Sequence, residues 1–230
     1  MFSNFDFDVI IRSLPYLFLD GMTFTLTLTA LATTGGVIFG TLLAMMRLSG
    51  FPLLSVPAAG YVNLMRSVPL LLVIFWFYFL VPYIGQWVTG ASRPIQVGAL
   101  VSSLVTFTLF EAAYFAEIMR AGIQSIPRGQ VSAAQALGMT YLQTMGYIVL
   151  PQAFRNMVPI LLTQTIILFQ DTSLVYVLSI TDFLGAASKV AQRDGRLVEM
   201  YLFAALVYFV ISYVASLLVR RLQSRIAIIR

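Results

Sequence analysis

Any chemistry in this chain would have to come from a few acidic residues set in long apolar stretches. The sequence of 230 residues contains no cysteine and no histidine. This composition removes thiolate nucleophiles, disulfides, the usual zinc ligands and imidazole bases. The sequence also lacks a Gly-x-x-x-x-Gly-Lys-Ser/Thr loop, which would hold nucleotide phosphates. We therefore predict no catalytic residue, no metal site and no cofactor in this chain.

Two carboxylic acids, Glu111 and Asp171, stand inside apolar stretches. An ionised carboxylate in hydrocarbon costs several kcal/mol unless it is paired, protonated or wet, so each residue is a candidate for a functional site. Polar side chains able to bind water or a zwitterion surround Asp171 in the sequence. The candidate substrate path comprises Glu111, Gln164, Gln170, Asp171, Thr172 and Ser173.

A structural role for Asp171 is equally open. Its carboxylate would accept backbone N–H bonds where a helix breaks, with Thr172 and Ser173 assisting. An ionised Asp171 would also repel an anionic ligand, so direct contact requires the ligand's ammonium group, a protonated carboxyl or an intervening arginine. Glu117 and Arg120, three residues apart on one helix face, are predicted to form a local ion pair rather than a gate.

The composition indicates that membrane-spanning helices position these side chains. Hydrophobic residues make up 60% of the sequence and charged residues 10%, the mean hydropathy is +0.91, and an ordinary soluble domain has about 25% charged residues. Five stretches are long enough to cross a bilayer as helices. They are residues 21–46, 68–88, 94–119, 157–176 and 200–219.

The basic residues predict how these five spans are threaded. An odd number of spans places the termini on opposite sides, and arginine and lysine favour the cytoplasm. With the C-terminus inside, nine basic residues fall on the cytoplasmic side and five outside. The predicted divisions are an N-terminal segment on the outer side (1–20), a membrane domain (21–220) with a cytoplasmic loop (120–155), and a cytoplasmic tail (221–230).

The N-terminus carries Asp6, Asp8 and Asp20 where a secretory signal would be positive, so we expect the first apolar stretch to be retained. That stretch has small residues at steps of four, which allow close helix packing. They are Ala32, Gly36, Gly40 and Ala44.

The loop at 120–155 is too long for a simple turn and needs structure of its own. A short helix is predicted to begin at Ser132, with small residues on one side and Leu137 available to pack. Such a helix fits a groove on a partner protein.

Within this loop the residues resemble the signature of permeases of binding-protein-dependent ABC importers, which is Glu-Ala-Ala, three residues, Gly, nine residues and Ile-x-Leu-Pro. This chain has that spacing, with Ser132 in place of the glutamate. The resemblance assigns coupling to an ATPase to Ser132, Ala133, Ala134, Leu137, Gly138, Ile148, Leu150 and Pro151.

The resemblance extends over nearly the whole chain. Residues 66–70, 116–120, 129–130 and 170–174 are similar to the polar amino-acid branch. Residues 110–114 and 168–176 resemble permeases of glutamate/aspartate importers.

The resemblance implies an all-α type I importer fold in the bacterial inner membrane, with several spans. It also implies a heterodimer with a sister permease, a cytosolic ATPase dimer that binds ATP and Mg, and a periplasmic amino-acid-binding protein. Membrane lipid is an expected partner, and nucleic acid is not. An alternative is an ion- or proton-coupled secondary transporter that uses Glu111 and Asp171 as relay groups. The sequence shows no internal inverted repeat, which disfavours that alternative.

Overall fold

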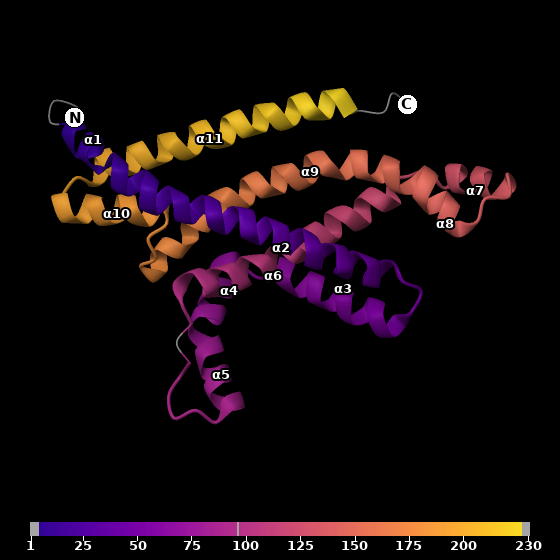
Figure 1. Ribbon diagram of the computed structural model, residues 1–230, viewed down its shortest axis with the longest axis horizontal. Coiled ribbons are helices and arrows are strands. Elements are labelled where there is room, and N and C mark those ends of the chain that lie inside the picture. The colour runs from indigo at the N-terminus through magenta and orange to yellow at the C-terminus, as the bar shows by residue number, and fades with distance from the viewer. Residues whose placement is uncertain (1–4, 96, 227–230) are drawn as a thin grey trace.

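The computed structural model describes residues 5–95 and 97–226, and its regular secondary structure there is entirely helical (Figure 1). Most of the helices extend along one long direction, with α1 (Phe7–Pro15) and α10 (Phe183–Asp194) at one end and α7 (Arg128–Ala136) at the other. Within the described ranges, five helical segments are long and apolar enough to cross a membrane. The predicted all-α fold with five spans is therefore confirmed.

The first spanning segment is an unbroken rod from Phe7 to Leu48. Asp6 begins it by accepting hydrogen bonds from the backbone N–H groups of the second and third residues after it, at 3.0 and 3.3 Å, which satisfies donors at the helix start. The rod contains α1 (Phe7–Pro15), a π-helical stretch η1 (Tyr16–Met22) and α2 (Thr23–Leu48).

This helix therefore begins about four turns before the predicted span of residues 21–46. A search for uncharged sequence stops at Asp20, but the helix continues through its charged residues because some of them find partners. Arg12, for example, has its Nη2 atom 3.0 Å from Oδ2 of Asp194.

The second spanning segment, Leu70–Thr89, follows the shorter helix α3 (Pro52–Ser67). It lies close to its predicted bounds and ends at Gly90, whose φ of +68° suits glycine. Its far end projects away from the other helices (Figure 1). The segment consists of α4 (Leu70–Phe75), the π-helical η2 (Trp76–Leu80) and α5 (Val81–Thr89).

The third segment is the single helix α6 (Ala99–Gln124), and the fourth runs from Tyr141 to Leu178. The helix begins sixteen residues before the predicted start of the fourth span at residue 157, because Gly146 and Pro151 do not break it. The fourth segment contains α8 (Tyr141–Gln143), the π-helical η3 (Thr144–Val149), α9 (Leu150–Asp171) and the 3₁₀ helix η4 (Thr172–Leu178).

Each of the π-helical stretches η1, η2 and η3 lies next to a proline. Pro15 precedes η1, Pro82 follows η2 and Pro151 follows η3. Proline lacks a backbone N–H and its ring collides with the carbonyl four residues earlier. For Pro82 and Pro151 that carbonyl lies in η2 and η3, whose wider turns accommodate the ring. The second and fourth spanning segments therefore stay continuous through these prolines.

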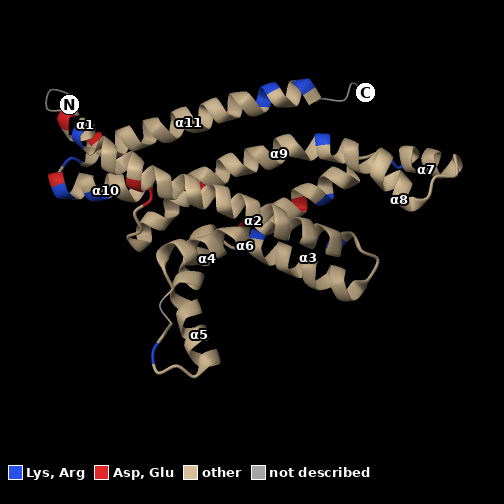
Figure 2. Cartoon of the chain, in the orientation of Figure 1, with Lys and Arg blue, Asp and Glu red and all other residues tan. Residues whose placement is uncertain are grey.

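The fifth segment is α11 (Leu197–Ile226), which follows α10 after a short turn. α10 begins at Asp182, whose carboxylate accepts hydrogen bonds from the N–H groups of Leu184 (3.1 Å) and Gly185 (2.9 Å). Charged residues gather toward the ends of the long direction, and few lie along the middle of the helices (Figure 2). This distribution is typical of a protein that spans a membrane.

Two helices, α2 and α6, form the most extensive contact in the fold. The predicted ridge of small residues on α2 is buried along its length. A Cβ atom at Gly40 would lie 2.8 Å from Cβ of Phe115 and 3.0 Å from the carbonyl oxygen of Ala112. The two backbones can approach this closely only because glycine has no side chain there.

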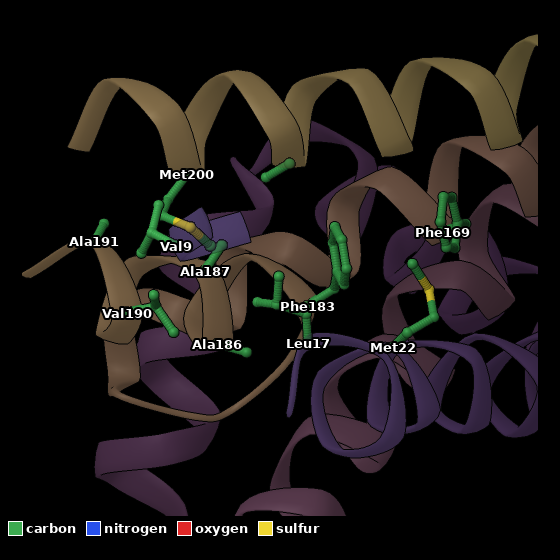
Figure 3. Packing of buried hydrophobic residues seen from close by; sticks show 11 residues of the cluster. Val9, Leu17, Met22, Phe169, Phe183, Ala186, Ala187, Val190, Ala191 and Met200 are labelled. Atoms are coloured by element: carbon green, nitrogen blue, oxygen red, sulfur yellow. The ribbon is translucent and has the colours of Figure 1, made fainter. Parts of the chain in front are cut away.

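A second core joins the N-terminal rod to α10 and α11. Phe183 is fully buried between Leu17 and Phe169, and Met200 of α11 reaches toward Val9 (Figure 3). The backbone N–H of Phe183 also donates to Oγ1 of Thr25 at 3.0 Å. These contacts fix α10 against the first spanning segment.

Candidate functional site

A cavity of about 430 Å³ opens among α3, α4, α6 and α9. The sequence Ser67-Val68-Pro69 creates its rim, because the residue before a proline is driven into an extended conformation. Val68 has φ −109° and ψ 135°, and α3 ends there before α4 begins. The cavity is lined by Arg66, Ser67, Val68, Pro69, Leu70, Phe110, Tyr114, Gln164, Ile167 and Asp171.

Arg66 supplies a positive charge to this cavity. Its guanidinium carbon lies 5.6 Å from the centre of the Tyr114 ring, a cation–π distance. The ring of Phe110 lies 5.2 Å from that of Tyr114 and supports it. The sequence gave neither Arg66 nor Tyr114 a role in a substrate site. The step of four between Phe110 and Tyr114, which puts them on one helix face, was the available signal.

Asp171 supplies a negative charge to the same cavity. Its side chain makes no capping hydrogen bond at the start of η4. The alternative role for Asp171 as a helix cap is therefore wrong, because the α9 helix continues into η4 without leaving the carboxylate beside free N–H groups. The acidic cap is instead provided by Asp182, at the start of α10.

Glu111 lies one layer behind the cavity wall and is fully buried. Nε2 of Gln164 donates to both carboxyl oxygens, at 3.1 Å to Oε2 and 3.3 Å to Oε1. Among the predicted path residues, Gln164 and Asp171 thus line the cavity, and Glu111 contacts it through Gln164.

The other three predicted path residues do not line the cavity. Gln170 is exposed on a different face of α9, and Thr172 is buried with its hydroxyl donating to the carbonyl of Phe169 at 2.7 Å. Ser173 is half-buried. Neighbours in sequence on a helix point in different directions, so a polar cluster in the sequence does not become a polar cluster in space.

Glu117 lies near the cavity at the centre of an arginine cluster. It accepts hydrogen bonds from Arg47 of α2 and Arg120 of α6, and its Oε2 atom lies 3.7 Å from Nη1 of Arg66. The predicted ion pair between Glu117 and Arg120 is confirmed. The structure adds two partners from other helices, which the sequence gave no means to find.

The predicted coupling segment forms a helical hairpin at the end of the long direction opposite α10 (Figure 1). Its helix α7 begins at Arg128, four residues before the predicted start, and ends in a turn. Gly138 donates to the carbonyl of Gln135, and Met139 donates to that of Ala134. This pair of bonds is the Schellman arrangement, which needs a left-handed residue, and Gly138 has φ +81°.

A small core attaches the hairpin to the spanning helices. Ile126, Val149 and Ala153 are buried together, and Nε2 of Gln152 donates to Oε1 of Gln130 at 2.6 Å. Ala134 also faces inward, with 4% of its surface exposed.

Most of the predicted coupling residues are on the surface of this hairpin. Leu137 is 84% exposed, and Ile148 is half-buried. Ser132, Ala133, Gly138, Leu150 and Pro151 are also exposed.

Large side chains near the hairpin tip are mostly exposed. Leu142 is 80% exposed, Tyr147 is 75% exposed, and Tyr141 beside them is 69% exposed. Large exposed side chains of this kind on a hairpin held by its own core indicate a contact surface.

At the opposite end, Asp182 has an unusual electrostatic environment outside the spanning segments. Burial raises the pKa of Asp182 to about 6, and the N–H groups that it caps oppose this rise. At the other end of α10, Arg12 and Arg193 hold the pKa of Asp194 below its usual value, chiefly through the hydrogen bond from Arg193. In the described part of the chain, no group of three or more acidic side chains is arranged to hold a metal ion.

The chain is similar over most of its length to membrane subunits of transport systems. The family described as the binding-protein-dependent transport system inner membrane component matches residues 36–228. The glutamate/aspartate import permease protein GltK of Escherichia coli O6:H1 is 57% identical over 224 residues, which cover 97% of this chain and 99% of that protein. The probable glutamine ABC transporter permease protein GlnP of Bacillus subtilis is 36% identical, covering 90% of this chain and 92% of that protein.

A solved structure has the same fold. In the crystal structure of an amino acid ABC transporter with histidines, one chain aligns with a TM-score of 0.86 and 32% sequence identity, covering 96% of this chain and 98% of that chain. The match confirms the type I importer fold that the resemblance in the loop implied, and the family match together with five apolar helices confirms the inner membrane as the location. The chain belongs to the family of inner membrane components of binding-protein-dependent transport systems.

Proposed function

We propose that this chain is the permease subunit of an ATP-driven importer for a polar amino acid, with glutamate or aspartate as its substrate. The observation that carries this proposal is the cavity in which Arg66 and Asp171 present opposite charges between spanning helices. The 57% identity to glutamate/aspartate permeases supports the choice of substrate.

The cavity suits a zwitterion better than a simple anion. Arg66 offers guanidinium donors to a carboxylate, and Asp171 offers acceptors to an ammonium group. The repulsion that an isolated Asp171 would exert on glutamate is offset by the arginine. A volume of about 430 Å³ is within the usual range for a small-molecule site.

ATP hydrolysis belongs to a separate ATPase dimer, which binds ATP and Mg and contacts this chain at the hairpin of residues 120–155. The exposed side chains of Leu137, Tyr141 and Leu142 support that contact. A compact hairpin with its own small core would pass a movement of the ATPase to α6 and α9, between which it is inserted.

The remaining partners are a sister permease, membrane lipid and a periplasmic amino-acid-binding protein. In this arrangement residues 1–20 and α10 face the periplasm, and the hairpin and residues 221–230 face the cytoplasm. The separation of α10 and α7 to opposite ends supports this orientation (Figure 1), as does the excess of basic residues on the proposed cytoplasmic side.

Uptake in proteoliposomes tests the proposal. We expect accumulation of radiolabelled L-glutamate only when the sister permease, the ATPase, the binding protein and ATP are all present. The matched control contains this chain alone, omits ATP and imposes a proton gradient. Uptake by this chain alone in that control would refute the proposal and favour a secondary transporter that relays ions through Glu111 and Asp171.

A further inference from the structure

The amide of Gln164 is held in one orientation by Glu111. Its nitrogen lies within hydrogen-bond distance of both carboxyl oxygens of Glu111. Both carboxyl oxygens accept from this same nitrogen, so the structure places the amide N–H donors of Gln164 against Glu111. Gln164 lines the cavity. Its carbonyl oxygen Oε1 is then the amide atom that remains available to a ligand there.

Glu111 is itself fixed by close packing. It is fully buried, and a Cβ atom at Gly36 of α2 would lie only 3.1 Å from Cβ of Glu111. The absence of a side chain at Gly36 therefore leaves the space that Glu111 occupies behind the cavity lining.

On the basis of the proposed function, we propose that Glu111 is a positioning residue that makes one end of the cavity specific for an ammonium group. It turns the carbonyl oxygen of Gln164 toward the cavity on the helix that also carries Asp171. Gln164 and Asp171 are seven residues apart on α9, two turns along the same helix face. That end of the cavity therefore presents acceptors, while Arg66 presents donors elsewhere on the wall.

This arrangement defines the ligand as a zwitterionic α-amino acid rather than any small dicarboxylate. An ammonium group can donate to the Gln164 carbonyl, and the Asp171 carboxylate, about 10 Å further along the helix, attracts its positive charge. A ligand without an ammonium group leaves these acceptors unpaired in a partly desolvated site, which is unfavourable. A ligand carboxylate at this end would also be repelled by Asp171.

Replacing Glu111 with glutamine tests the positioning role. The introduced amide can donate as well as accept, so it allows Gln164 to turn its nitrogen toward the cavity. The probe is radiolabelled L-glutamate, bound to the purified complex of this chain with its sister permease and ATPase, without the binding protein. The competitor is glutarate, which has the same two carboxylates and no ammonium group.

We expect Glu111→Gln to weaken glutamate binding about tenfold, the usual weight of one charge-assisted hydrogen bond. Glutarate binding should change little, so the preference for glutamate over glutarate should fall by the same factor. A purely structural role for Glu111 would weaken both ligands together and leave their ratio unchanged.

The exchanged pair Glu111→Gln with Gln164→Glu gives the decisive comparison. The amide at position 111 then donates to the carboxylate at position 164, which keeps an acceptor oxygen for the cavity. We expect this double variant to recover the preference for glutamate. If the single variant does not assemble, the double variant decides alone, and a preference lost in it would overturn the proposal.

Thr163→Val is the matched control on the same helix. The Thr163 hydroxyl donates to the carbonyl of Pro159 at 2.9 Å and does not line the cavity, so both affinities should stay as in the unmodified complex. An unchanged ratio in Glu111→Gln would overturn the positioning role alone. No glutamate binding by the unmodified complex would overturn the cavity as the substrate site and the positioning role with it.

Discussion

Replacing Gly138 with alanine should loosen the end of the coupling hairpin without any steric clash. A Cβ atom at Gly138 would meet nothing within 4 Å, but the residue has φ +81°. A residue with a side chain pays about 1–2 kcal/mol in the left-handed region. The whole effect of this substitution should therefore come from the backbone.

Gly129 of α7 provides the matched control. A Cβ atom there also meets nothing within 4 Å, and its φ is outside the left-handed region. Gly129→Ala should be neutral or stabilise the helix by up to about 1 kcal/mol. The two alanine variants should therefore differ by about 2 kcal/mol, which corresponds to roughly a thirtyfold difference in how often the hairpin end unwinds.

Hydrogen exchange of the amides of Gly138 and Met139 in the purified complex measures this difference, since both donate to the last turn of α7. Glutamate uptake per ATP hydrolysed measures its consequence for coupling. We expect Gly138→Ala to reduce both protection and coupling, and Gly138→Asn to retain more of each, because asparagine tolerates the left-handed region. Equal protection in the two alanine variants would refute the reasoning from backbone conformation.

Three further predictions follow from close packing, charge geometry and burial. Gly40→Ala should destabilise the chain by about 1–3 kcal/mol because its Cβ meets backbone atoms of α6. Gly60→Ala should not, because its Cβ meets nothing within 4 Å. Thermal denaturation of the complex distinguishes the two variants, and equal midpoints would contradict the packing argument. Arg66→Lys should raise the KM for glutamate uptake without affecting assembly, since lysine keeps the charge but loses the planar fork of donors. An unchanged KM would show that Arg66 does not bind the substrate. Because the pKa of Asp182 is about 6 in the folded chain against an ordinary 3.8, its contribution to stability is present below about pH 4 and is lost as the pH rises toward 6 and above. Asp182→Asn keeps a capping oxygen but does not titrate, so its melting temperature should fall less than that of the unmodified complex between pH 4.5 and 7.5; parallel curves would contradict this assignment.

The amino-acid sequence by itself determined the class of this protein and the number of its spans. Sixty per cent hydrophobic residues and so few charges leave no material for a soluble surface. The spacing of Ala134, Gly138 and Pro151 indicated the family, which the match over residues 36–228 confirms. The ridge through Gly36 and Gly40 was also readable, because a helix repeats its faces at steps of three to four.

Helix boundaries were less readable, because they depend on partners distant in the sequence. Asp20 and Pro151 both indicate interruptions, yet the helices continue through them. A charge is tolerated where the fold places it near water or a partner, and a proline is tolerated beside a π-helical stretch.

Only the tertiary structure decided the site. Arg66 and Asp171 are 105 residues apart in the sequence (171 minus 66) and line one cavity, and Glu117 gathers arginines from three helices. Such meetings depend on how helices rotate and cross, which is set by the packing of α2 against α6 and not by the local sequence around any one charge. The sequence therefore indicated which residues were costly to bury, and the packing of the helices determined which of them face one another.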